Sequence, residues 1–190
     1  MKWSDNEMEL FQGRPLDVTG RLPREVRVYD YLDRLNIPYE RTDHEEVHTM
    51  EDLYEADKIL GVVLCKNLFL CNRQKTDFYL LSMPADKPFK TKELSGQLGI
   101  SRLSFADPQD LLKYLDIEPG AVSVMGLMND TAHKVRLLMD EEIRGDEFFG
   151  CHPCVTTASL KIKMQDILER FLPETGHTTT WVTLKGDVNQ

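Results

Sequence analysis

The spacing of apolar residues divides the chain into helical and extended segments. After Pro23, which suits the first position of a helix, apolar residues recur at intervals of three from Val26 to Leu35. This pattern predicts a helix over residues 23–36. Capping residues and similar spacing predict four further helices, over residues 49–60, 91–98, 107–115 and 161–172.

Extended segments alternate with these helices. Residues 61–71 and 78–83 flank a polar turn, which predicts a β-hairpin. Shorter runs predict strands over residues 37–42, 121–128, 135–140 and 178–184. Single helices mixed with hairpins predict an α+β fold with a mixed sheet.

The organisation along the chain is simple. Gly13, Pro15 and Gly20 interrupt any periodicity, so residues 1–20 are expected to form an irregular N-terminal extension. Residues 21–186 are expected to form one domain, because 190 residues suffice for a single well-buried core.

The composition is that of an ordinary globular protein, with 41% hydrophobic and 29% charged residues. The longest apolar run, residues 61–70, is interrupted by Lys66 and Asn67, and it falls short of the ~20 apolar residues that cross a bilayer. No apolar core of signal-peptide length follows the N-terminus. We therefore expect a cytoplasmic location and no membrane partner.

The net charge of −9 is unevenly distributed. Residues 1–60 hold 15 acidic and 8 basic residues, and the remaining 130 hold 17 acidic and 15 basic residues. A protein that grips duplex phosphates carries a basic face, so simple DNA binding is disfavoured. Any nucleic acid is expected to touch a small area.

Four cysteines raise the question of a disulfide or a metal site. Cys151 and Cys154 have CxxC spacing around His152, which leaves a redox or zinc protein as one alternative. Cys65 and Cys71 are six residues apart, which is not a usual spacing for zinc ligands. We expect separate thiols, with no metal and no cofactor.

Three segments carry candidate chemistry. Lys66 lies on a leucine face of a predicted strand, either at a sheet edge or in a pocket that holds an anion. Residues 119–126 place glycines around small residues, so this backbone either approaches a ligand or turns into a strand. His152 precedes Thr156 and Thr157, whose hydroxyls suit either a polar ligand or a strand. Alone, these features specify no activity.

Five short motifs occur in the order of a known family. They are Lys66-Asn67-Leu68-Phe69-Leu70, Arg102-Leu103-Ser104-Phe105-Ala106, Pro119-Gly120-Ala121-Val122-Ser123, Gly126-Leu127-Met128-Asn129-Asp130, and His152-Pro153 with Thr157-Ala158. Together they resemble the YbaK and prolyl-tRNA-synthetase-associated editing domains, and most closely the freestanding ProXp-ala branch. The similarity extends from about Pro23 to Leu184. It implies a compact domain with a mixed, strongly curved β-sheet surrounded by helices.

The resemblance also implies roles for individual residues. Lys66 is implied to be required for activity and to anchor the terminal adenosine of a tRNA. The loop from Gly120 to Val124 is implied to close over the substrate ester and to offer backbone N–H groups to its carbonyl. His152 is implied to line the aminoacyl pocket, so Lys66, Gly120 and His152 are the expected catalytic residues. The expected substrate-binding residues are Asn67, Ala121, Val122, Ser123, Val124, Met125, Gly126, Thr156 and Thr157.

The implied activity is hydrolysis of mischarged Ala-tRNA(Pro) after the synthetase has released it. Such sites lack a protein nucleophile, and water attacks the ester with help from the ribose hydroxyl of the substrate. An activated ester suits this mechanism, because positioning and oxyanion stabilisation supply much of the acceleration. The expected partners are the 3′ acceptor end of proline tRNA and prolyl-tRNA synthetase.

The chain departs from the family pattern at several positions. Val124 replaces the usual proline, Met125 a phenylalanine, Thr156 an asparagine and Ser159 a threonine. Two alternatives therefore stay open beside the redox or zinc protein. One is a deacylase of Cys-tRNA(Pro), and the other is a catalytically silent domain of the same fold that binds tRNA or a synthetase.

Overall fold

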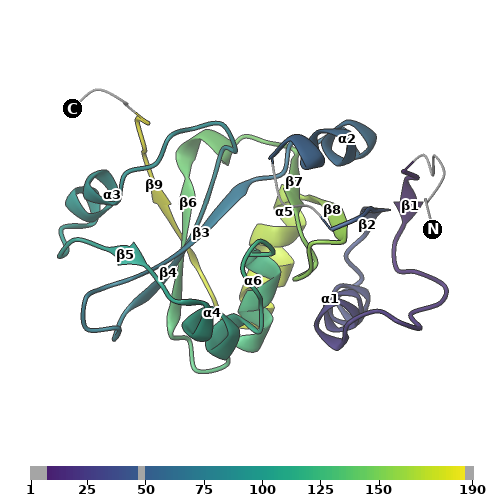
Figure 1. Cartoon of the computed structure of the whole chain (residues 1–190), viewed down its shortest axis with the longest axis horizontal. Helices are drawn as coiled ribbons and strands as arrows, with labels where there is room; N and C mark the ends of the chain where they lie inside the picture. The colour runs from purple at the N-terminus through teal and green to yellow at the C-terminus, as the bar shows by residue number, and fades with distance from the viewer. Residues whose placement is uncertain (1–7, 47–49, 187–190) are drawn as a thin grey trace.

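The computed structural model describes residues 8–46 and 50–186, whose strands form two β-sheets (Figure 1). The first sheet is antiparallel, and its strands in spatial order are β1 (Phe11–Gln12), β2 (Tyr39–Asp43), β8 (Ala158–Lys163) and β7 (Phe148–Cys151). The second is mixed, in the order β5 (Ser104–Phe105), β3 (Lys66–Cys71), β4 (Phe78–Met83), β6 (Val135–Asp140) and β9 (Thr179–Val182).

Helices and short helical turns connect the strands of both sheets. They are α1 (Pro23–Arg34), α2 (Met50–Leu60), α3 (Thr91–Leu98), α4 (Pro108–Leu115), the 3₁₀ turns η1 (Val124–Asn129) and η2 (Glu141–Ile143), and a last helix built from α5 (Met164–Asp166), the π-helical turn η3 (Ile167–Phe171) and α6 (Leu172–Thr175). Figure 1 shows α3 beside the five-stranded sheet, on the side farthest from the four-stranded one. No helix in the described ranges is long and apolar enough to cross a membrane.

The α+β prediction is confirmed, and several elements match their predicted bounds. The hairpin of β3 and β4 pairs Lys66 with Met83 and Cys71 with Phe78, as the polar turn between them requires. Helix α3 ends at Gly99, whose φ of 65° is the left-handed conformation typical of a C-terminal stop. The predicted cap of residues 49–60 depends on Thr49, which lies outside the described residues, and on the side chain of Asp52, which is not described either.

The strands lie in two sheets instead of the single mixed sheet that the pattern predicts. An isolated pairing of Leu64 with Gly150 connects the start of β3 to β7 across the gap between the sheets. The predicted strand over residues 61–71 begins only at Lys66, because Gly61 turns the chain with a φ of 63°. The segment expected to be irregular contributes β1, which pairs with β2.

The predicted strand over residues 121–128 is wrong, because this segment forms the 3₁₀ turn η1. The Ser123 hydroxyl accepts the N–H of Met125 at 3.2 Å and so caps the turn. Gly126 then packs against Leu115 at the end of α4 and against Ile117 just beyond it, where an added Cβ would lie 2.6 Å from the Cδ1 atom of Ile117. Side-chain capping and close packing favour a turn at this position.

The predicted helix over residues 161–172 is also wrong at both ends. Residues 158–163 form β8, with Leu160 and Ile162 fully buried, because strand alternation prevails over helical spacing here. The helix continues through Pro173 to Thr175. The π-helical turn η3 precedes this proline, and such a wider turn relieves the missing N–H that would otherwise break the helix.

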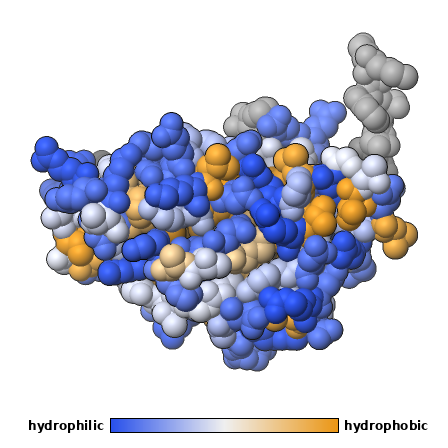
Figure 2. Space-filling view, turned by 90° about the horizontal axis from the view of Figure 1, so that it is seen from below, coloured by the Kyte–Doolittle hydropathy of each residue, from blue (hydrophilic) through white to orange (hydrophobic). Residues whose placement is uncertain are grey.

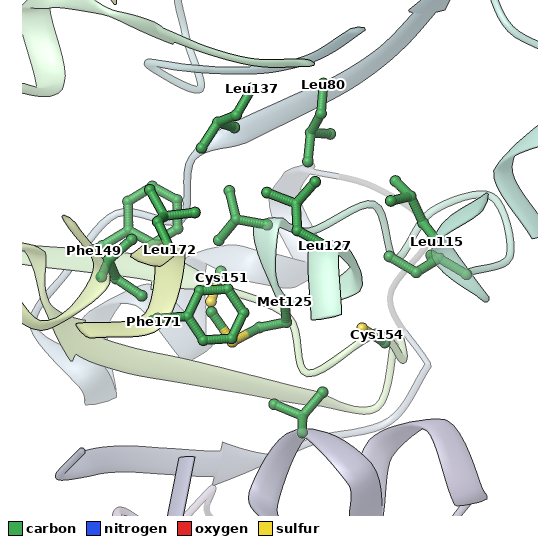
Figure 3. Packing of buried hydrophobic residues seen from close by; sticks show 14 of the residues in the cluster. Leu80, Leu115, Met125, Leu127, Leu137, Phe149, Cys151, Cys154, Phe171 and Leu172 are labelled. Carbon is green, nitrogen blue, oxygen red and sulfur yellow. The ribbon is translucent and has the colours of Figure 1, made fainter. Parts of the chain in front are cut away.

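Two hydrophobic cores hold the fold together. The larger core lies between the sheets, and Figure 3 shows Met125 and Leu127 of η1 among Phe149 and Cys151 of β7 and Phe171 of the last helix. The smaller core joins the outer face of β3, β4 and β6 to α3. Figure 2 shows one face of the molecule, on which hydrophobic residues form separate patches in a mainly hydrophilic surface.

Candidate functional site

The glycine-rich loop lies against the segment that follows His152. Gly120 is exposed and has a φ of 93°, a left-handed conformation that favours glycine. A Cβ on Gly120 would lie 3.3 Å from the Cγ2 methyl of Thr156. The Thr156 hydroxyl donates in turn to Glu46 at 3.4 Å. Two of the predicted segments are therefore brought together, although 36 residues separate Gly120 from Thr156 in the sequence.

Backbone N–H groups of this loop are available to a ligand. The N–H of Ala121 donates to the carbonyl of Glu118 at 3.2 Å and is thereby occupied. The N–H groups of Gly120 and Val122, two residues that reach the surface, have no hydrogen-bond partner in the part of the chain that the structure describes, whereas Ser123 is fully buried. Exposed donors of this kind can stabilise an oxyanion.

His152 is buried, with 7% of its surface exposed, and its orientation is fixed. Its Nδ1 atom lies 2.9 Å from the carbonyl of Ala158, so Nδ1 carries the proton and donates it. Burial, opposed by the hydrogen bond to Ala158 and helped by the neighbouring His44, lowers the pKa of His152 to about 4. The ring is therefore neutral at pH 7, and its Nε2 atom is a hydrogen-bond acceptor.

His44 is a functional candidate that the sequence did not indicate. Its ring lies edge-on to that of His152, with 6.3 Å between the ring centroids. Its Nδ1 donates to the carbonyl of Glu45 at 2.8 Å, so its Nε2 accepts from the Ser159 hydroxyl at 2.9 Å. The backbone N–H of His44 donates to the carbonyl of Thr157 at 3.0 Å. Only folding brings these residues together, because Ser159 is 115 residues away.

Lys66 lies apart from the loop and from His152. As the alternation predicts, it shares its face of β3 with Leu68, which packs into the smaller core near α3. Its Nζ donates to the carbonyl of Lys87 in the segment between β4 and α3. Burial lowers the pKa of Lys66, and the carboxylate of Asp86 opposes this change. In the described ranges no contact joins Lys66 to Gly120 or His152.

The start of β3 connects these two groups. The N–H of Cys65, the residue before Lys66, donates to the carbonyl of Gly150 at 3.2 Å, two residues before His152. On the other face of β3, the Asn67 side chain accepts from the Ser82 hydroxyl at 2.5 Å and donates to the carbonyl of Cys65 at 3.0 Å. Asn67 thus fixes the backbone beside the lysine.

Five residues of the expected substrate-binding set are buried. Ala121 is 2% exposed, Ser123, Val124 and Met125 have no exposed surface, and Gly126 is buried against Leu115 and Ile117. They can support the loop from behind, whereas Gly120 and Val122 reach the surface. Thr157 is exposed and contributes its carbonyl to the contact with His44.

The cysteines do not show the features of a redox motif. All four are free thiols, and Cys151 and Cys154 are buried. Burial raises the pKa of Cys151 to about 12, against a hydrogen bond with Ser123, whereas reactive CxxC motifs have lowered pKa values. In the described ranges no three His, Cys, Asp or Glu side chains gather as a metal site would require.

Asp130, at the end of the fourth motif, has a structural environment. Its carboxylate accepts the N–H groups of Lys134 and Val135 at 2.9 and 2.8 Å, and His177 lies 3.0 Å away. These contacts close the turn before β6 and tie it to the last helix.

Comparison with known sequences gives consistent matches. A family model described as an aminoacyl-tRNA editing domain matches residues 44–170, a range that begins at His44 and includes every candidate site residue. A prolyl-tRNA synthetase associated domain-containing protein 1 from Danio rerio is 36% identical over 151 residues, which cover 78% of this chain and 81% of that protein. The prolyl-tRNA editing protein ProX from Acetoanaerobium sticklandii is 32% identical over 147 residues, which cover 77% and 89%.

The fold also matches solved structures. The chain superimposes with a TM-score of 0.63 on a structure described as a candidate trans-editing enzyme for prolyl tRNA synthetase. The match covers 86% of this chain and 98% of that chain at 15% sequence identity. At this identity the likeness shows the fold alone.

Proposed function

Because the chain belongs to the aminoacyl-tRNA editing domain family, we propose that it is a trans-editing deacylase that hydrolyses Ala-tRNA(Pro). The observation that supports this most directly is the pairing of unoccupied loop N–H groups with a neutral histidine. Gly120 lies against Thr156, and His152 lies four residues before Thr156. A carbonyl oxygen and an attacking water can therefore be held by one small region of the surface.

The proposed mechanism uses positioning rather than a protein nucleophile. The N–H groups of Gly120 and Val122 receive the oxyanion that develops on the ester carbonyl. The Nε2 atom of His152 accepts a hydrogen bond from water or from the amino group of the substrate. With a pKa of about 4, His152 is too weak a base to remove a proton from water efficiently at pH 7. The vicinal ribose hydroxyl of the substrate therefore assists the water.

Lys66 is proposed to act on a different part of the substrate. Its amine is half-buried and donates to a backbone carbonyl, so a phosphate or hydroxyl of the terminal adenosine can replace that acceptor. Lys66 lies one residue beyond the contact of Cys65 with β7. This arrangement allows the adenosine to be held beside β3 while the aminoacyl ester reaches the loop.

The choice between alanine and cysteine depends on the volume behind the loop. A methylene group changes discrimination by only ~1–3 kcal/mol, so a small pocket excludes proline more readily than it separates alanine from cysteine. Single-turnover deacylation of Ala- and Cys-charged proline tRNA, at saturating protein, tests the assignment. Faster loss of alanine supports it, and faster loss of cysteine would assign the other substrate. No loss of either ester would favour a catalytically silent domain.

Val124→Pro is expected to leave the protein folded and to speed removal of alanine about two- to fivefold. Val124 is the first residue of η1, a position where proline is well accepted. A proline there stiffens the loop, and such substitutions stabilise by roughly 0.4–1 kcal/mol at compatible sites. Activity on Pro-tRNA(Pro) should not appear, since a stiffer loop does not enlarge the pocket. Single-turnover rates on both charged tRNAs check this, and a large loss of alanine activity would contradict the assigned loop role.

The pH dependence of the free energy of unfolding should show that His152 is neutral in the folded chain. An unfolded histidine titrates near 6.5, whereas His152 in the folded chain has a pKa of about 4. Between these values only the unfolded chain binds the proton, so stability is complete above pH 6.5 and falls as the pH drops through this window. The contribution between pH 7.5 and pH 5 is about 2 kcal/mol.

The matched variant is His152→Asn, which removes the titrating ring. Its free energy of unfolding, measured in urea at both pH values, should fall by about 2 kcal/mol less than that of the wild type. An equal fall in both proteins would show that His152 is not held neutral in the folded chain.

A further inference from the structure

A surface beside Lys66 is locally basic and aromatic, in contrast to the acidic chain as a whole. Between Asp86 and Asp107 the sequence has four basic residues and a single acidic one, Glu93. Glu93 accepts the backbone N–H of Lys185 at 2.6 Å, and Lys87 is paired with Asp140 at 2.6 Å and with Glu142 at 2.5 Å. With four basic residues and one acidic residue, the segment has a formal charge of +3, which the chain's overall charge of −9 does not predict.

Phe105 is exposed on this surface, although it is a large apolar side chain. It lies on β5, the edge strand of the five-stranded sheet, and 60% of its surface is exposed. The ring of Phe89 supports it edge-on, with 6.3 Å between the ring centroids. A large aromatic ring held in place from one side offers its remaining surface to a partner.

Three side chains converge on one short segment, residues 87–91, between β4 and α3. Lys66 donates to the carbonyl of Lys87, Phe105 contacts Phe89, and Arg102 lies 3.5 Å from the Thr91 hydroxyl. Four residue steps of chain span at most about 14 Å. Stacked nucleotides advance about 3.4 Å each along one strand, so the segment is comparable in length to four nucleotides.

We propose that this surface, formed by Phe105, Arg102 and Lys92 along residues 87–91, binds the acceptor end of the tRNA. Phe105 stacks on a base, and Arg102 and Lys92 contact phosphates, as in sites for single-stranded nucleic acid. Lys92 is exposed. The inference rests on the proposed function, because it places the tRNA next to the lysine that holds the terminal adenosine. Charge favours this occupant, since the acidic N-terminal third repels a polyanion.

The test separates binding from chemistry. Single-turnover deacylation of Ala-tRNA(Pro) gives a rate at saturating protein and a protein concentration for half-maximal rate. Phe105→Leu keeps an apolar contact with Phe89 and removes the stacking ring, whereas Phe105→Tyr keeps the ring. We expect the leucine variant to raise the half-maximal concentration about 5- to 100-fold without changing the saturating rate. The tyrosine variant should resemble the wild type.

The roles of Arg102 and Lys92 are tested by the salt dependence of tRNA binding. Arg102→Ala and Lys92→Ala should each reduce the slope of log affinity against log salt by about one, as loss of a phosphate contact does. Lys163→Ala, an exposed lysine in the other sheet, is the matched control and should leave the slope unchanged. An unchanged half-maximal concentration in Phe105→Leu, or a fall in the saturating rate alone, would overturn the proposal.

Failure of the proposed function would be distinguishable from failure of this surface. If the wild type hydrolyses no charged tRNA, the dissociation constants of the wild type and the variants for uncharged proline tRNA can still be compared. They test whether Phe105, Arg102 and Lys92 bind the tRNA. Variants that bind this tRNA normally but no longer bind prolyl-tRNA synthetase would assign the surface to a protein partner and overturn the proposal.

Discussion

Lys66→Met is expected to reduce deacylation of Ala-tRNA(Pro) by about 10²-fold, because the adenosine that Lys66 holds positions the ester and a misplacement of about 1 Å costs a rate factor of that size. Methionine retains the apolar stem on the leucine face of β3 and removes the amine. The fold should survive, because the amine makes one hydrogen bond, to the carbonyl of Lys87, in the part of the chain that the structure describes. Single-turnover rates and thermal unfolding together measure both effects.

Lys163→Met is the matched control for this experiment. Lys163 is exposed at the end of β8, in the sheet that does not contain Lys66. Its variant should retain the wild-type rate. Full activity of a folded Lys66→Met protein would remove Lys66 from the site.

The second large effect is expected for Gly120→Ala. An alanine must adopt a φ of 93°, and strain of this kind costs of order 1–3 kcal/mol. Its Cβ would also lie 3.3 Å from the Thr156 methyl, so the loop or this side chain must move by a few tenths of an ångström. Misplacement by about 1 Å can reduce a rate about 10²-fold, and we expect the smaller shift and the strain together to cost roughly tenfold.

Gly99→Ala separates strain from displacement. Gly99 also has a positive φ, 65°, but nothing lies within 4 Å of a Cβ at that position. Its variant should lose stability to a similar degree and keep the wild-type deacylation rate. Equal activities for the two alanine variants would indicate that the position of Gly120 does not matter for chemistry.

The sequence predicted elements well where local signals agreed. The hairpin of β3 and β4 has a polar turn between two apolar runs, and the end of α3 has a glycine that must adopt a left-handed conformation. Such signals depend on neighbouring residues alone. The family motifs also lay within one matched range, residues 44–170.

Prediction from the sequence failed where a side chain formed hydrogen bonds that changed the backbone conformation. It also failed where residues distant in the sequence determined the local structure. The Ser123 hydroxyl turns a strand-like sequence into η1, and Leu160 and Ile162 are fixed as a strand by pairing with β2 and β7. The contact of His44 with His152 depends on β2 lying beside β8. No sequence pattern near His44 predicts this contact.

The geometry of the candidate site also could not be predicted from local sequence patterns. The sequence placed Lys66, Gly120 and His152 in one set, but it could not show that Lys66 faces α3 while His152 faces the other sheet. It also could not show that Val124 and Met125 belong to the core. Alternation assigns residues to faces of a strand, whereas the partner of each face depends on the tertiary fold.

Hydrolysis of Ala-tRNA(Pro) by this protein is tested most simply by measuring how much charged tRNA accumulates in a reconstituted reaction. Proline tRNA, prolyl-tRNA synthetase, ATP and either alanine or proline are incubated with and without this protein. We expect that Ala-tRNA(Pro) fails to accumulate when the protein is present, while Pro-tRNA(Pro) accumulates to the same level in both reactions. Equal accumulation of Ala-tRNA(Pro) with and without the protein would contradict it.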